Sequence, residues 1–207
     1  MDEHAAVRRE YGRLAAIYDR RWRSYVEAAV RETLARTEVA RGAAVLDVGC
    51  GTGVLLEALR ARGGPGRLVG TDLSREMLRV AHARLAGAAG LCQASAEGLP
   101  FAGGSFDLVV STNAFHYFRH AEAALAEMRR VLRPGGRLVL TDWCDDYLAC
   151  RLCDLVLRLI DPSHFRTYGS AECRRLLERA GLSVLLLDRY KITWLWGLMT
   201  AVAERAD

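Results

Sequence analysis

Two acidic side chains, Asp47 and Asp72, each end an apolar run of the kind that forms a β-strand. Glycines follow the first run at alternate positions, Gly49, Gly51 and Gly53, and a helical pattern begins directly afterwards. A glycine turn can bring its main chain against a bound molecule, and the start of the next helix offers unpaired N–H groups to the same place. Because open α/β sheets bind ligands beyond the carboxyl ends of their strands, this order predicts a ligand site there.

The spacing of these residues limits what the ligand can be. The dinucleotide fingerprint has its third glycine three places after the second, whereas Gly53 follows Gly51 by two. The Asp47 carboxylate would repel a pyrophosphate and suits a cation or hydroxyls, for example the ammonium of an amino-acid moiety. Asp72 is placed to accept hydrogen bonds from both hydroxyls of a ribose, at a spacing that NAD also uses. The sequence thus predicts a nucleoside ligand and leaves the cofactor open at this point.

The elements that must position these residues alternate between strand and helix. Strands are expected over residues 44–48, 67–72, 91–94, 106–111 and 137–141, with helices over 54–62, 75–86 and 121–132. A helix over 171–181 then precedes an antiparallel hairpin of strands at 183–190 and 197–203. Ser74 and Ser170 are expected to cap helices, and Pro134 with its two glycines is expected to turn the chain after the helix that ends near residue 132.

The chain contains five segments in a fixed order: VLDVGCGTG, GTDLSREML, ASAEGLPF, FDLVVSTNAFHYF and RRVLRPGGRLVLTDW. They resemble the ordered motifs of class I S-adenosylmethionine-dependent methyltransferases, in particular the small-molecule branch that includes quinone C-methyltransferases. The resemblance runs from about residue 11 to the C-terminus. It implies an α/β fold with a Rossmann-like, seven-stranded sheet, mostly parallel with an antiparallel last strand, and helices on both faces. It also implies a single domain over 1–207, with a helical lid at 1–40 and a substrate-side insertion at 143–169.

The same resemblance implies S-adenosylmethionine as the cofactor. Ser95 stands where the family usually has an aspartate that accepts a hydrogen bond from the adenine amine, so adenine recognition is expected to depend more on the Ala96 main chain. Met77 would suit a helix core equally well. The implied cofactor contacts are Tyr18, Asp47, Gly49, Cys50, Gly51, Gly53, Asp72, Leu73, Met77, Ser95, Ala96, Asn113 and Ala114.

Residues 4–37 have apolar positions at helical spacing and resemble the N-terminal lid of the family. Tyr18 is the expected contact to the methionine part of the cofactor, and Asp19 and Trp22 are expected to pack the lid. An ordinary amphipathic helix on the surface of the domain would give the same pattern.

His116 follows the fourth strand and is the imidazole placed to act as a general base. A packed helix residue that donates to a carbonyl is an equal alternative for it. Further substrate contacts are expected from Trp143, His164, Arg166 and Tyr168, although a solvent-facing role suits Arg166 as well. Trp194 and Trp196 are expected either to line the substrate mouth or to form a contact in a homodimer; these two tryptophans lie on the loop between the last two strands.

The six cysteines are expected to be reduced thiols that behave as small hydrophobic side chains. Cys150 and Cys153 share a helix face, but two further zinc ligands at suitable spacing are missing, so no metal site is expected. A thiophilic acceptor such as arsenite is the alternative that this pair leaves open.

The composition is that of an ordinary globular domain, with 51% hydrophobic and 26% charged residues. The net charge of +4 comes from scattered arginines rather than a basic stripe, which argues against a nucleic-acid partner. No apolar run reaches the length of a membrane span, and the charged N-terminus does not resemble a secretory signal, so a cytoplasmic protein is expected.

The expected function is methyl transfer to a small-molecule acceptor by in-line displacement, which needs alignment and exclusion of water rather than a catalytic triad. A non-catalytic S-adenosylmethionine-binding subunit that supports a partner enzyme is the alternative from another class. A nicotinamide oxidoreductase is disfavoured, because Val54 stands where its third glycine would be and a YxxxK pair is missing.

Overall fold

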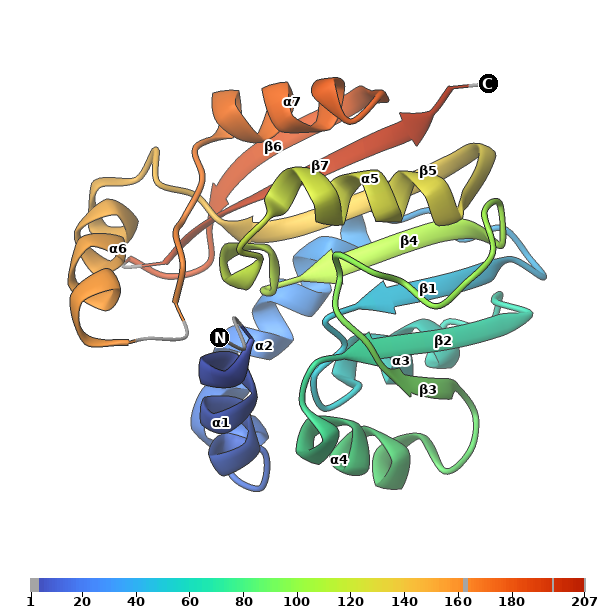
Figure 1. Cartoon of the computed structure of the whole chain (residues 1–207), viewed down its shortest axis with the longest axis horizontal. Coiled ribbons are helices and arrows are strands. Elements are labelled where there is room, and N and C mark those ends of the chain that lie inside the picture. The colour runs from blue at the N-terminus through green and yellow to red at the C-terminus, as the bar shows by residue number, and fades with distance from the viewer. Residues whose placement is uncertain (1–3, 162–163, 195, 207) are drawn as a thin grey trace.

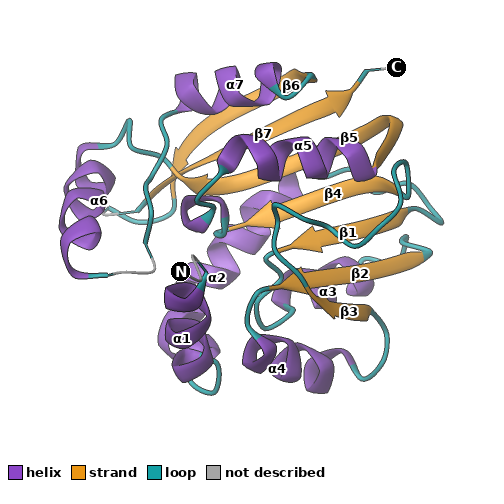
Figure 2. Cartoon of the chain, in the orientation of Figure 1, coloured by secondary structure: helices purple, strands orange, loops and turns teal. Residues whose placement is uncertain are grey.

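The fold is built on one seven-stranded sheet, which is drawn in orange in Figure 2. The computed structural model describes residues 4–161, 164–194 and 196–206. In chain order the strands are β1 (Ala44–Val48), β2 (Arg67–Asp72), β3 (Gly90–Gln93), β4 (Phe106–Thr112), β5 (Leu132–Trp143), β6 (Leu182–Lys191) and β7 (Gly197–Arg205). Their order across the sheet is β3-β2-β1-β4-β5-β7-β6, with β7 antiparallel to both of its neighbours. The expected fold class is therefore confirmed.

Helices cover both faces of the sheet because successive strand residues point to opposite sides. Val45 packs with the face covered by α2 (Tyr18–Ala35), α3 (Val54–Ala61) and α4 (Arg75–Leu85). Leu46 packs with the opposite face, under α5 (Ala121–Val131) and α7 (Ser170–Arg179). Two further elements, α1 (Ala5–Leu14) and η1 (Phe115–Tyr117), lie at the edge where β1 and β4 end. α6 (Leu148–Ile160) follows β5 and lies apart, beyond the same end of the sheet (Figure 1).

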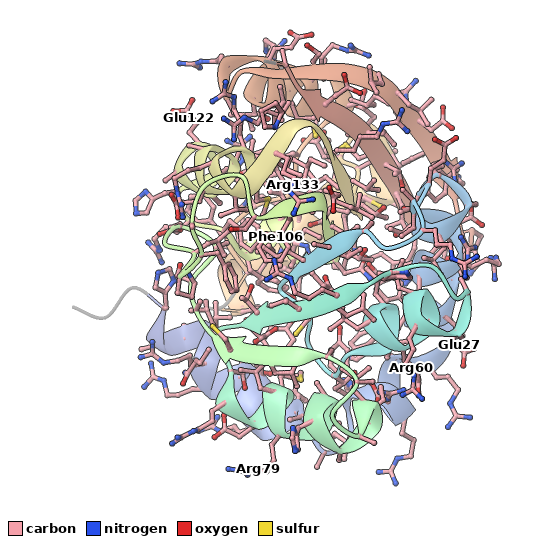
Figure 3. The ribbon with its side chains drawn as sticks, turned by 90° about the vertical axis from the view of Figure 1, so that its right-hand side faces the viewer. Glu27, Arg60, Arg79, Phe106, Glu122 and Arg133 are labelled. Carbon is pink, nitrogen blue, oxygen red and sulfur yellow. The ribbon has the colours of Figure 1, made fainter. Side chains whose placement is uncertain are left out.

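Charged side chains of the helices point away from this core. Figure 3 shows Glu27, Arg60, Arg79 and Glu122 at the periphery, and all four are exposed. Phe106 in contrast is fully buried in the sheet. This arrangement agrees with the interpretation of the scattered arginines as solvated surface. Within the described part of the chain, no helix has the length and apolarity needed to cross a membrane.

The expected lid pattern over residues 4–37 is divided into two helices. α1 ends at Leu14, and α2 begins at Tyr18 and contains a kink at Trp22, where φ is −116° and ψ is 16°. Tyr18 before the kink and Val26 and Val30 beyond it face the cavity described below, and Thr33 in the last part of α2 is buried against the sheet. The part of α2 beyond the kink is thus both anchored on the sheet and part of the cavity wall.

The segment after α5 differs from the expected turn. The strand begins at Leu132, directly after the helix, and pairs there with Phe106. Pairing then resumes between Arg137 and Leu108 after a bulge. Pro134 and the glycines therefore form an irregularity inside β5, because an edge of β4 is available to pair with the chain as soon as the helix stops.

Only one of the two expected serine caps is present. The Ser74 hydroxyl accepts a hydrogen bond from the Met77 N–H at 3.2 Å, which confirms the cap of α4. The prediction for Ser170 was wrong, since it is the first residue of α7 and its hydroxyl donates to Asp146 at 2.5 Å. The same carboxylate accepts from the Ser170 main-chain N–H at 3.3 Å, so a residue distant in sequence performs the capping.

Candidate active site

One cavity lies where the carboxyl ends of β1, β2 and β4 meet the N-terminal helices, and it encloses about 970 Å³ including its open mouth. Four parts of the chain reach this cavity: the glycine turn after β1, Asp72 at the end of β2, the loop after β3 and the end of β4. Twelve of the expected cofactor contacts line it: Tyr18, Asp47, Gly49, Cys50, Gly51, Asp72, Leu73, Met77, Ser95, Ala96, Asn113 and Ala114.

The turn after β1 approaches the end of β4 closely because of Gly49. Its φ of +76° is a conformation that other residues rarely adopt, and a Cβ there would lie 2.5 Å from the Cβ of Ala114. Gly53 in contrast does not line the cavity. Its α-carbon faces α4, where an added Cβ would meet Ala81 at 3.1 Å, so it allows α3 and α4 to pack closely.

The cavity is acidic on its β1 and β2 side. Asp47 is 2% exposed, and among the described residues its carboxylate has no hydrogen-bond partner. Burial, reinforced by the neighbouring carboxylate of Asp72, raises the pKa of Asp47 to about 8. A buried carboxylate without a partner is costly, so this position suits a ligand that brings a cation.

Asp72 is held in a fixed orientation at the end of β2. One carboxylate oxygen accepts from the Gly51 N–H at 2.9 Å, and the other accepts from the Ser74 N–H at 2.8 Å. Burial raises the pKa of Asp72, and these two hydrogen bonds oppose that shift. Each oxygen keeps further acceptor capacity, which fits the two hydroxyls of a ribose.

The loop after β3 contributes Ser95 and Ala96 to the wall. The Ser95 hydroxyl accepts from the Glu97 N–H at 3.2 Å, so it stabilises the loop and can still accept or donate toward a ligand. Met77 lines the same region with 1% of its surface exposed. It therefore belongs to the helix core and to the cavity wall at once.

The N-terminal helices close over this site. Tyr18 lines the cavity, and burial, followed by the charges of Asp72 and Asp19, raises the pKa of its hydroxyl. Asp19 was expected only to pack the lid, but it accepts a hydrogen bond from the Thr52 hydroxyl at 2.6 Å and pairs with Arg84. Thr52 belongs to the glycine turn, so Asp19 ties the lid to the part of the chain that faces the ligand.

Tyr25 is a site residue that the sequence interpretation missed. Its hydroxyl donates to the Asn113 side-chain oxygen at 2.7 Å and accepts from the Trp143 indole N–H at 2.5 Å. Asn113 has a φ of +56°, and the tyrosine fixes its side chain at the cavity wall. A signal was present, because Tyr25 follows Tyr18 by seven residues and thus shares its helix face.

His116 lies beside the cavity and does not line it. Its Nδ1 is 2.6 Å from one oxygen of Asp142, and its main-chain N–H donates to the other at 2.9 Å. The ring stacks on Trp143 at 5.0 Å, while its neighbour Tyr117 lines the cavity with its ring centroid 3.9 Å away. Asp142 was missed as a site residue, although it ends a strand as Asp47 and Asp72 do.

The remaining expected substrate contacts divide into two groups. Trp143 and His164 form a cluster with His116. The ring centroid of His164 lies 6.0 Å from that of Trp143 and 5.5 Å from that of His116. His164 is buried, which lowers the pKa of its imidazole, and its Nε2 lies 2.8 Å from Asp154.

The other two lie outside the cavity wall. Arg166 pairs with Glu172 at 2.6 Å and lies over the ring of Tyr168. Tyr168 is buried and packs on Phe115, with ring centroids 4.7 Å apart.

The cysteines do not gather into a site. Cys50 lines the cavity, Cys150 contacts the Gly197 main chain, and none of the six cysteines, all of which are described, forms a disulfide. Over residues 4–161, 164–194 and 196–206, no three histidine, cysteine or acidic side chains are placed to hold a metal ion.

Comparison with known proteins points to one family. Residues 46–140 match the model of a methyltransferase domain. Over 115 residues the chain is 39% identical to a ubiquinone/menaquinone biosynthesis C-methyltransferase of Cupriavidus necator, which covers 54% of this chain and 47% of that protein. The chain thus spans about half the length of the curated relatives it matches.

Two solved structures extend the likeness to most of the chain. One belongs to a complex between the Trm112 methyltransferase activator and a candidate methyltransferase of Haloferax volcanii. It is 26% identical, with a TM-score of 0.83, and the match covers 96% of this chain and 98% of that chain. The other is an S-adenosylmethionine-dependent methyltransferase of Mesorhizobium loti, 20% identical with a TM-score of 0.73, covering 86% and 98%, and it shows the fold alone.

The cavity supplies an independent test of the cofactor. A carboxylate without a partner, a second one oriented at the end of β2 and a main-chain cradle at Gly49 fit the ammonium, the ribose and the close approach of S-adenosylmethionine. Geometry, family model and relatives therefore agree that residues 46–140 match a methyltransferase domain and that the chain is similar to S-adenosylmethionine-dependent methyltransferases of the quinone C-methyltransferase type.

Proposed function

We propose that this chain transfers a methyl group from S-adenosylmethionine to a small-molecule acceptor by in-line displacement. The observation that carries the proposal is Asp47, a buried carboxylate without a partner among the described residues, beside Asp72 in one cavity. A cationic ligand that also carries a ribose would compensate the cost of burying both groups. The relatives support this interpretation, because they are named as C-methyltransferases.

Each part of the cofactor has residues suited to hold it. Asp47 would bind the ammonium, and Asp72 the ribose hydroxyls, as the acids at the ends of β1 and β2. Ser95 and the Ala96 main chain would meet the adenine, and Asn113 would meet the amino-acid part. Tyr18 would cover the methionine portion from the lid side.

When bound, the cofactor supplies a methyl group on a cationic sulfur. The protein's task is then to align an acceptor and exclude water. Tyr11, Tyr18 and Tyr117 present aromatic rings to the cavity, with Tyr11 and Tyr117 in edge contact at 5.2 Å. Ring faces attract cations and repel water, so this wall suits both tasks.

His116 would accept a proton if the acceptor has to lose one. Asp142 holds Nδ1, which leaves Nε2 as the nitrogen that can take up a proton. The position beside Tyr117 means that an acceptor would have to reach past that ring to meet the imidazole.

The acceptor we propose is a planar ring. Tyr25, Trp143 and Trp196 form an aromatic cluster behind the cavity wall, with 4.5 Å between the two tryptophan centroids. His116 joins this cluster to Tyr117 of the wall. Flat rings pack well against such a surface, and the relatives named above act in quinone biosynthesis according to their name. His164 would support this wall, whereas Arg166 and Tyr168 would act on the acceptor only through their neighbours. We also propose a cytoplasmic location and keep a homodimer as a hypothesis.

A second candidate is an S-adenosylmethionine-binding subunit that works only with a partner protein. The Haloferax volcanii structure favours it, since the matched protein is there in a complex with a methyltransferase activator. Calorimetry with S-adenosylmethionine and its demethylated product, followed by a screen of quinols and phenols, separates the two. Binding together with transfer supports the enzyme, and binding without transfer to any acceptor supports the subunit.

The Asp47→Asn variant tests the cofactor site directly. We expect its affinity for S-adenosylmethionine to fall about 10- to 100-fold, because a charge-assisted hydrogen bond to the ammonium is lost. Asp188→Asn is the matched control, since Asp188 is a half-exposed acid on β6 that pairs with Arg36. Equal affinity in Asp47→Asn and in the wild type would contradict the proposed site.

A further inference from the structure

Helix α6 exposes its apolar face. Six large apolar side chains lie on one side of the helix because of their spacing along it. Each is more than half exposed: Leu148, Leu152, Leu155, Val156, Leu159 and Ile160. Leu159 reaches 81% exposure. Exposed apolar surface of this extent is uncommon on a monomer and marks an interaction site.

The opposite face of α6 is fixed to the protein, so the exposed face is a feature of the folded state. The Cys150 sulfur lies 3.2 Å from the Gly197 main-chain nitrogen. Asp154 accepts from the Thr167 N–H at 2.6 Å and lies 2.8 Å from His164 Nε2. These contacts leave the six apolar side chains directed outward, and Figure 1 shows α6 at the end of the sheet, away from the other helices.

The turn between β6 and β7 lies against the fixed side of α6, since the Lys191 ammonium lies 5.7 Å from the centre of the Tyr147 ring and Gly197 touches Cys150. Trp194 in this turn is itself 84% exposed. We call the six apolar residues of α6 the α6 face.

The charges along α6 that face solvent are positive, whereas Asp161 stands at its C-terminal cap. The single acid of the helix, Asp154, is buried, and the solvent-facing charges of α6 are Arg151 and Arg158, which lie seven residues apart on one border of the apolar side. Arg158 pairs with Asp154 at 2.6 Å, and Arg151 is exposed. Lys191 is exposed at the end of the adjoining hairpin.

We propose that the α6 face docks on the surface of a lipid bilayer that contains anionic headgroups. A leucine-rich helix face bordered by arginines has the composition of helices that lie in the membrane interface. At 13 residues α6 is about 20 Å long, which is too short to span a bilayer and suits a position in its plane. This proposal does not depend on the proposed methyl transfer.

The charge pattern favours a bilayer over a second copy of the chain. Two copies that met through this face would bring their arginine borders together, whereas anionic headgroups would pair with them. A single convex helix also needs no matching groove in order to enter a deformable lipid surface.

Sedimentation of the full chain with vesicles tests the proposal. We expect the wild type to bind phosphatidylcholine vesicles more tightly when they contain phosphatidylglycerol. The double variant Leu155→Glu, Leu159→Glu should bind at least about tenfold more weakly, because two apolar chains no longer enter the bilayer. Arg151→Glu should weaken binding to the anionic vesicles about fivefold. Leu185→Glu, at an exposed leucine of β6, is the matched control and should bind as the wild type does.

Thermal unfolding and S-adenosylmethionine binding show that each variant is folded, and these two measurements do not involve lipid. The proposal is overturned if the wild type does not bind anionic vesicles, or if the double variant binds them as well as the wild type does. It is also overturned if light scattering finds a dimer that the double variant dissociates, since the α6 face would then belong to a second copy.

Discussion

Asp47 combines deep burial with a carboxylate that no neighbour among the described residues satisfies. Its pKa of about 8 lies above the ordinary value of 3.8, and burial is the main cause. Asp142, also buried, accepts hydrogen bonds from the main-chain N–H of His116 and of Trp143 at 2.9 and 2.6 Å. At the residue scale, the two acids therefore have different functions: Asp142 stabilises its surroundings, and Asp47 awaits a ligand.

The unliganded protein should be more stable with asparagine at position 47. The folded state holds a proton on Asp47 that the unfolded state releases above about pH 4. The contribution of protonated Asp47 to the free energy of unfolding is therefore fully present below about pH 4 and is lost as the pH rises towards about 8. We expect Asp47→Asn to raise the free energy of unfolding by about 1–3 kcal/mol at pH 8 and to change it little at pH 4. Urea denaturation at both pH values measures this, and a pH-independent difference would contradict it.

His116 provides the second prediction at this scale. Removal of a general base lowers kcat by about 10²- to 10⁴-fold, and we expect this of His116→Asn with acceptors that must lose a proton. Cofactor affinity should stay the same, because His116 does not line the cavity. His82→Ala, at an exposed histidine of α4, is the control. Unchanged turnover at saturating acceptor would assign His116 a purely structural role.

At the scale of elements, α2 connects the lid to the sheet. Beyond the kink at Trp22, the Thr33 hydroxyl lies 2.9 Å from that of Thr141, which lies 2.8 Å from that of Thr200. This chain of buried hydroxyls fixes the second half of α2 against β5 and β7. Before the kink, Asp19 makes the connection to the glycine turn.

Loss of this connection should speed the release of the cofactor. In Asp19→Asn the pairing with Arg84 is lost and the contact to Thr52 is weakened, so the lid should open more often. We expect the dissociation rate of S-adenosylmethionine to rise about 5- to 50-fold, which stopped-flow fluorescence can follow. Glu27→Gln, an exposed acid of the same helix, should leave the rate unchanged. Equal rates in all three proteins would show that the lid does not retain the ligand.

At the scale of the whole molecule, binding, folding and pH are linked through the cavity. A bound ammonium would favour the ionised form of Asp47, so binding near pH 7 should release up to one proton. Affinity should therefore fall as the pH is lowered below about 8, by up to about tenfold per pH unit. Calorimetry in two buffers with different ionisation enthalpies measures the released proton. This linkage would be contradicted by a binding heat that is the same in both buffers. It would also be contradicted by a buffer dependence of the binding heat that is unchanged in Asp47→Asn.

The sequence allowed the sheet and most of the cavity wall to be predicted for a physical reason. Strand runs and glycine turns are local signals, and β1 was located at the residues where it occurs. The capping of α7 by Asp146 could not be predicted, because the carboxylate arrives from a segment distant in sequence. The outward face of α6 was missed for a similar reason, since an apolar helix pattern does not reveal which side the protein covers.

The kink at Trp22 also determines where the chain can be cut. Arg20, Arg21 and Arg23 flank it, and all three side chains are exposed. A protease that cleaves after arginine needs several residues of backbone to leave their helical form, and the kink is the place in α2 where that costs least. Digestion by trypsin should thus begin there and slow when the ligand holds the lid down, so that a gel band can report the state of the active site.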